Sequence, residues 1–231
     1  FDAAVNVAGN VDINTSTLTL DGPLTTTAGG TVTVTNSGVA DINANITAAG
    51  TVRFDGPVSG RIDIGLDGPA RAILTIETTD PGAAILVDAA GVLLTGDTAM
   101  TTNDGAIAFG GDVAGTFTLT LTAGAGDVDF NDTIGTAAPL FSLQIVSSAN
   151  VDIEGTSTIS SGGITINTGT IDIRGTVTTI TGGVIDVVHT GIALIAASVE
   201  SSGRIEFDGG GDIVINATVG TAAGSHSDIV L

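Results

Sequence analysis

A repeat of about 20 residues runs through almost the whole chain and limits the folds that it can adopt. Each unit begins with a small residue, usually Gly, followed by two aliphatic or aromatic residues at alternate positions and a polar turn. Examples are GTVTV at 30–34, GDVDF at 126–130 and GTIDI at 169–173. With a double gap after the fourth unit, the first aliphatic residue of each unit is assigned to Val11, Val32, Val52, Ile73, Ile107, Val128, Val151, Ile171, Ile192 and Ile213.

The two most similar units are GDVDFNDTIGTAA at 126–138 and GDIVINATVGTAA at 211–223, about four periods apart. A second segment of strict alternation, such as FTLTLTA at 117–123, recurs within the periods and is typical of a strand with one buried face. Because a unit this small cannot bury its own apolar face, we expect successive units to stack. The sequence predicts an all-β, parallel β-helix (β-solenoid) of about eleven coils with a repeat of roughly 20–21 residues. Residues 1–231 form one rod, with a less regular stretch at 80–105.

The composition supports strands and excludes several partners. The chain has no Lys, Trp, Tyr or Cys, and its five positive residues are Arg53, Arg61, Arg71, Arg174 and Arg204. Val, Ile and Thr, which favour strands, replace the usual helix formers. The net charge of −20 excludes nucleic acid as a partner, since phosphates need Lys and Arg. No apolar run reaches the roughly 18 residues of a membrane span, so no membrane insertion is expected.

The units resemble those of filamentous-haemagglutinin-type adhesins and related large bacterial β-strand-repeat surface proteins. The shared pattern is Gly, Asp or Thr, Val or Ile, any residue, an apolar residue, then Asn or Asp, as in GDVDFN at 126–131 and GTVRFD at 50–55. The resemblance covers nearly the whole chain and is weakest at 80–105. It implies a right-handed parallel β-helix at the cell surface or outside the cell. The implied role is an adhesin stalk or a filament, sheath or surface-layer subunit, without catalysis.

An acidic segment, GDVDFNDTIGT at 126–136, is the candidate site. In a strand, Val128 and Phe130 point inward, so the residues between and before them point outward. Aligning the units places Asp129, Asp152 and Asp172 in one column on successive coils. Like charges on neighbouring strands are destabilising, and a bridging Ca²⁺ would offset the repulsion. The predicted metal ligands are Asp127, Asp129, Asn131, Asp132, Asp152 and Asp172. A solvated acidic face is the other interpretation, and no cofactor is required.

Four Phe residues occupy what the alignment treats as a single inward slot: Phe54, Phe109, Phe130 and Phe207. Phe109 and Phe130 belong to neighbouring coils, so we expect their rings to stack.

Two other functions are open. A β-helix enzyme that degrades polysaccharide would need a pair of carboxylates, which the Asp-rich coils offer, but sugar-binding aromatic residues and Lys are missing. His189 and His226 are the two histidines, and each is expected to be an isolated strand or loop residue. An ice-binding Thr array is suggested by TVTVT at 31–35 and TLTLT at 118–122, but the slot of Thr33 holds Asp or Arg on other coils.

Both ends of the chain, FDAAVNVAG at 1–9 and SHSDIVL at 225–231, are readable as strand without a capping helix. An uncapped solenoid edge is a template for another strand. The predicted partner is therefore the chain itself, end to end, as a filament or within a longer solenoid. A host or cell-surface receptor or glycan is the second predicted partner.

Overall fold

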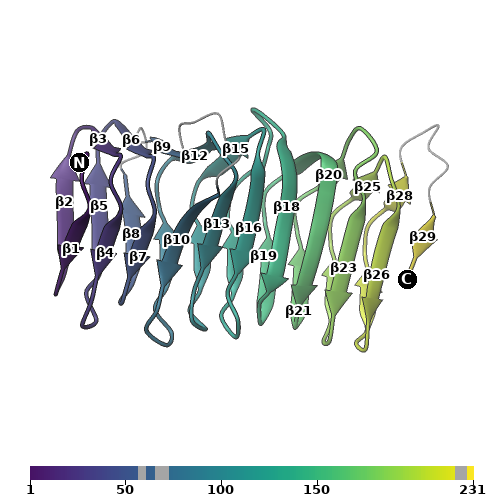
Figure 1. Cartoon of the computed structure of the whole chain (residues 1–231). Coiled ribbons are helices and arrows are strands. Elements are labelled where there is room, and N and C mark those ends of the chain that lie inside the picture. Colours follow the sequence, from purple (N-terminus) through teal and green to yellow (C-terminus); the bar gives the residue numbers. More distant parts are fainter. Residues whose placement is uncertain (57–60, 66–72, 222–227) are drawn as a thin grey trace.

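A stack of parallel strands forms one elongated body in the computed structural model, which describes residues 1–56, 61–65, 73–221 and 228–231. Figure 1 shows the chain advancing from one end of the stack to the other, with each coil beside the next. All strand pairs in the described part are parallel and no helix occurs there. The predicted all-β solenoid is thus confirmed. Arg71, His226 and the last two residues of the repeat at 211–223 lie outside the described residues.

Face 1 of the solenoid is, among the described residues, a sheet of ten strands, one from each coil. Nine spacings of about 4.8 Å give this sheet a length on the order of 45 Å. Its strands are β2 (Val11–Thr15), β5 (Val32–Asn36), β8 (Val52–Asp55), β11 (Ile85–Val87), β14 (Ile107–Phe109), β17 (Val128–Phe130), β19 (Asn150–Ile153), β21 (Thr170–Ile173), β24 (Ala193–Ile195) and β27 (Ile213–Ile215).

Two further faces complete each coil. Face 2 contains β3 (Leu18–Leu20), β6 (Val39–Ile42), β9 (Arg61–Ile64), β12 (Gly91–Leu94), β15 (Asp112–Gly115), β22 (Val177–Thr179), β25 (Val199–Ser201) and β28 (Val219–Thr221). Face 3 contains β1 (Val5–Val7), β4 (Leu24–Thr26), β7 (Ile46–Ala48), β10 (Leu74–Thr78), β13 (Thr98–Thr101), β16 (Thr118–Thr122), β18 (Leu140–Ser147), β20 (Ser157–Thr168), β23 (Ile185–His189), β26 (Ile205–Gly209) and β29 (Ile229–Val230). The long β20 serves both faces, because its first part pairs with β22 and its second with β23.

The register corrects two positions of the repeat. Ile73 is 57% exposed and Ile192 is 53% exposed, so neither fills the inward slot. Ile85 pairs with Val52 and Ala193 pairs with Ile171, which places these two residues in the slot instead. The coil that begins at Val52 is therefore one long coil, and face 1 has ten strands where about eleven coils were expected. Within 80–105, β11, β12 and β13 pair with strands on both sides.

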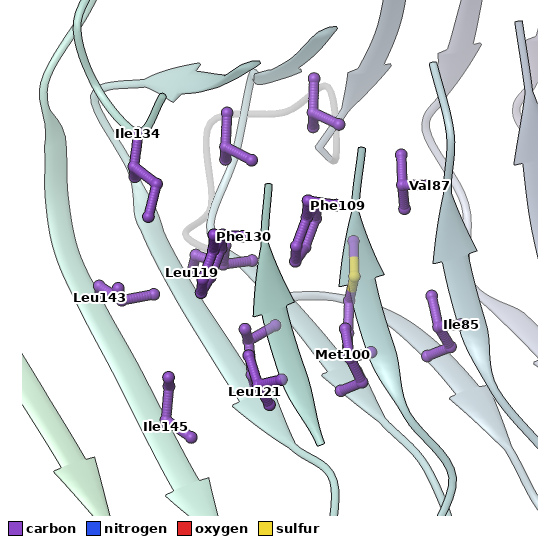
Figure 2. Close-up of a cluster of buried hydrophobic side chains, with 14 of the residues drawn as sticks. Ile85, Val87, Met100, Phe109, Leu119, Leu121, Phe130, Ile134, Leu143 and Ile145 are labelled. Carbon is purple, nitrogen blue, oxygen red and sulfur yellow. The ribbon is translucent and has the colours of Figure 1, made fainter. Parts of the chain in front are cut away.

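Large side chains fill the interior in layers, as Figure 2 shows for the middle of the rod. Phe109 and Phe130 are fully buried and stacked, with ring centroids 5.1 Å apart and planes 2° from parallel, as predicted. Phe54 shares their row through Val87. Phe207 is buried too, but it lies on β26 of face 3 and pairs with Val187, so its predicted slot was wrong. The segment IEFDG at 205–209 has the residue pattern of a face 1 strand, but it belongs to face 3.

Buried hydroxyl groups close several of the corners that follow face 3 strands. Thr26, Thr78 and Thr102 donate hydrogen bonds of 2.5–2.7 Å to backbone carbonyl oxygens three to five residues later. His189 takes this position on β23, pairs with Thr168 and donates from Nδ1 to the carbonyl oxygen of Gly191 at 2.7 Å. The corner therefore explains a buried His that the sequence marked only as an isolated strand residue.

Replacing Phe130 with Asp tests the inward slot. A carboxylate there would lie between two coils without a partner, and we expect a loss of at least about 3 kcal/mol in the free energy of unfolding. Urea unfolding followed by circular dichroism measures it. Phe141→Asp is the control, since Phe141 is 47% exposed and its replacement should change the midpoint far less. A wild-type midpoint for Phe130→Asp would contradict the assignment.

Candidate functional site

Three aspartates form a column on the outer side of face 1. Asp129 on β17 pairs directly with Asp152 on β19, which pairs with Asp172 on β21, as the repeat predicted. Each lies between two inward residues, because alternate side chains of a strand point to opposite sides. The inward neighbours of the three are Val128, Phe130, Val151, Ile153, Ile171 and Ile173. The buried slots hold the outward carboxylates in register.

The column is limited to three coils. Ala108 precedes it, paired with Asp129, and Leu194 follows it, paired with Asp172. Nearer the N-terminus, the same slot holds Asp12, Thr33 and Arg53. This order also separates the two Thr-rich segments, since TVTVT lies largely in β5 of face 1 and TLTLT is β16 of face 3. The described register therefore offers no shared Thr array for these two segments.

Asp129 experiences the repulsion within the column. Burial raises the pKa of its carboxyl above the usual value, and the negative charges of Asp152, Asp127 and Glu154 raise it further. A raised pKa means that the folded state binds the proton more tightly than the unfolded chain does. The ionised column thus costs stability at neutral pH.

Arg174 neutralises the other end of the column. Its Nε and Nη2 donate to Oδ2 of Asp172 at 2.9 and 2.6 Å, and its Nη1 donates to Oε1 of Glu154 at 2.8 Å. The hydrogen bond to Asp172 raises the pKa of the guanidinium. Oδ1 of Asp172 is buried and has no hydrogen-bond partner. Neither Arg174 nor Glu154 was among the predicted site residues.

A signal for this ion pair was present in the repeat. Asn131, Glu154 and Arg174 occupy one slot, because their amides donate to Phe109, Phe130 and Ile153, each on the preceding coil. The sequences VDIE at 151–154 and TIDIR at 170–174 therefore place opposite charges on adjacent coils. Aligning the outward residues two positions after the aspartates would have predicted the pair.

Pairs of an Arg with an outward carboxylate also occur on other coils. On face 2, Asp41 pairs with Asp63, and Arg61 on the same strand as Asp63 binds both of its carboxylate oxygens at 2.6 and 2.7 Å. Arg53 contacts Asp55 on its own coil and Asp88 on the next one at 2.6 Å. Arg204 pairs with Glu206. Each Arg in the described part of the chain thus pairs with an outward carboxylate, and Arg53 and Arg174 join two coils in doing so.

The remaining predicted ligands lie beside the column. Asp127 is exposed just before β17 and acts on Asp129 through its charge. Asn131 and Asp132 are exposed in the turn after β17, where Oδ1 of Asp132 accepts a hydrogen bond from the amide of Thr133 at 2.8 Å. Across the described ranges, no three or more His, Cys, Asp or Glu side chains are grouped so that they could hold a metal ion. Calcium binding therefore stays a prediction. The described side chains form a column of three aspartates with an Arg at one end.

Comparison with known proteins finds no match: no family model, no curated protein and no solved structure is similar to the chain at a significant level.

Replacing Asp129 with Asn should stabilise the protein at neutral pH by up to about 1 kcal/mol, because one of the facing like charges is removed. The gain should disappear as the pH falls through the raised pKa of Asp129 and below the usual Asp value of about 3.9, since the carboxyl is then protonated in both states. Thermal melts at several pH values measure it. Asp12→Asn is the control, because Asp12 faces Thr33. An equal gain in both variants would contradict the repulsion.

Replacing Asp129, Asp152 and Asp172 together with Asn tests the calcium prediction. If Ca²⁺ bridges the column, the wild-type melting temperature rises in millimolar calcium and that of the triple variant does not. Asp12, Asp80 and Asp212, which are exposed, provide a control triple that removes the same charge elsewhere. A calcium response that survives in the column variant would place the cation at another site.

Proposed function

We propose that the chain is a structural rod of an extracellular or cell-surface assembly, acting as an adhesin stalk segment or as a subunit of a filament, sheath or surface layer. The observation that carries this proposal is the unbroken apolar core, which continues from Leu18 to Phe207 through every described coil. Parallel ladders join each coil to the next, so the core is linear and rigid along its axis. The charged side chains of the described residues occupy outward slots and turns, where Arg53 and Arg174 each pair with a carboxylate on a neighbouring coil.

End-to-end contact with another solenoid coil is the predicted mode of self-association. Ile215 at the C-terminal end is 38% exposed, whereas Ile195 in the same slot one coil earlier is 0% exposed. A cavity of about 620 Å³ lies beside it, lined in part by Phe207, Ile213 and Val230. A further coil would cover these apolar side chains, whether it comes from a second copy or from a longer solenoid.

An enzyme that degrades polysaccharide is the rival proposal, and the acidic column is where its carboxylates would lie. The ion pair supports a structural role for Asp172 instead, because Arg174 holds its carboxylate. Receptor or glycan binding by the stalk belongs to the structural proposal, with no residue assigned to it.

Negative-stain electron microscopy of the purified chain, in millimolar calcium and then in chelator, is the test of the structural role. We expect rods, either single and short or joined into filaments along the axis. Filaments lost in chelator would place calcium at the joint, and short rods in both conditions would favour a stalk segment. Compact particles without an axis, or release of sugars from polysaccharide by the purified chain, would contradict the proposal.

A further inference from the structure

An apolar patch lies on one side of the rod, well away from both ends. Its members, which we call the side patch, are 38–51% exposed and belong to two coils separated by one other coil: Phe141, Val146, Ile180, Val184 and Val188. Phe141 and Val146 are in β18, Val188 is in β23, and the other two flank the corner that leads into β23. Large exposed apolar patches on soluble proteins mark contact surfaces more often than single exposed residues do.

Packing makes the side patch continuous across the intervening coil. A methyl carbon at Gly162 would lie only 2.9 Å from Cε1 of Phe141, so the ring covers that glycine. A methyl carbon at Gly163 would meet the backbone of Val184 at 2.4 Å. Further along the strands, Asn167 pairs with Val188, while Val146 directly follows Ile145, the partner of Ile166. The coil of β19 and β20, which lies between the two coils that carry the side patch, thus contributes Gly and uncharged residues that do not project beyond its neighbours.

The charge around the side patch contrasts with the rest of the chain. The outward residues of β13, β16, β18 and β20 on face 3 are uncharged: Ala99, Thr101, Thr120, Thr122, Gln144, Val146, Thr165 and Asn167. Carboxylates border this uncharged area: Asp186 lies on β23, and Asp97, just before β13, accepts a hydrogen bond from the amide of Thr118 at 2.9 Å. On the coils of β18 and β20 the outward residues of face 3 are uncharged while face 1 carries Asp129 and Asp152, whereas the coil of β23 carries Asp172 on face 1 and Asp186 on face 3.

The lack of charge on this part of face 3 indicates which partner binds the side patch. Two copies of a chain with a net charge of −20 repel each other unless they meet where the outward residues are neutral. We propose that the side patch is the surface through which two copies associate laterally, with face 3 of one rod against face 3 of the other. The proposal rests on the structural role proposed above and names the partner, a second copy of this chain. A two-fold axis through the patch would make the contact self-complementary.

The extent of the surface sets the strength of the contact. Five strands from β13 to β23 span about 20 Å along the axis, and each contributes about 17 Å of strand length. The buried area is therefore at the low end for specific interfaces, below about 1,200 Å² in total. A weak, concentration-dependent dimer is expected, and many such contacts in a row would join longer rods side by side. Salt should strengthen the dimer, because it screens the repulsion between the two acidic bodies.

Sedimentation velocity on four proteins tests the proposal, at about 0.05 M and about 0.5 M salt. The wild type should dimerise reversibly, and more strongly at high salt. Val188→Asp should raise the dissociation constant at least about tenfold, because each copy would bring a carboxylate into an apolar contact. Val39→Asp on face 2 and Val214→Asp at the C-terminal end are matched controls, since all three Val residues are 40–42% exposed. Both controls should dimerise like the wild type.

Three outcomes would overturn the lateral contact: a wild type that stays monomeric at both salt concentrations, a Val188→Asp variant that dimerises normally, or loss of association in Val39→Asp. Loss in Val214→Asp alone would assign self-association to the end of the rod. Circular dichroism melts show that each variant is folded before its association is measured. Failure here leaves the rod itself untouched, because electron microscopy reports its shape independently of lateral pairing.

Discussion

Every part of this structure depends on the parallel backbone ladder between successive coils. A coil of some twenty residues has no interior of its own, so its inward side chains are buried only by the coils above and below it. Ile215 illustrates the point, since it is much more exposed than Ile195, which has coils on both sides. The ladder fixes the distance between coils and also fixes which side chains become neighbours on the surface. Core packing and surface electrostatics are therefore consequences of the same register.

The register brings outward residues of equal slot together whether or not their charges agree. Asp129 and Asp152 are neighbours because Val128 and Val151 share an inward slot. The burial of apolar side chains in the core offsets this repulsion. Arg174 reduces it at one end of the column by bridging Glu154 and Asp172. The Arg residues in the described part of the chain all lie beside carboxylates. A chain without Lys can keep a high negative charge for solubility while its stacked coils remain stable.

The sequence was sufficient for the fold class and for most of the column, because both follow from spacing. Alternation identifies inward residues, and a constant period aligns them. The prediction was wrong where a strand of another face has the same residue pattern, or where the length of the coil changes. Phe207 lies in a segment that looks like the face 1 unit but belongs to face 3, and the coil after Val52 is longer than the rest, which displaced the slot to Ile73. Ala193 was missed because a small residue fills a slot that aliphatic residues fill elsewhere, while Ile192 beside it points out. Side-chain partners such as Arg174 and Glu154 need the alignment of a second slot, which the inward pattern alone does not supply.

Outward slots are free to vary because the core does not depend on them, and this freedom allows different sides of one rod to acquire different chemistry. On the coils from β17 to β20, face 1 presents carboxylates while face 3 presents Phe, Val, Gln, Thr and Asn, and on the next coil face 3 adds Asp186. Both faces are built on the same ladder, so neither arrangement compromises the other. In a globular domain, a charged column and an apolar patch would compete for a small common surface. In a solenoid they are separated by the width of the core, and additional coils of the same kind would extend each as a stripe along the rod. The uncharged outward residues of face 3 from β13 to β20 provide the kind of surface that side-by-side association of acidic rods requires.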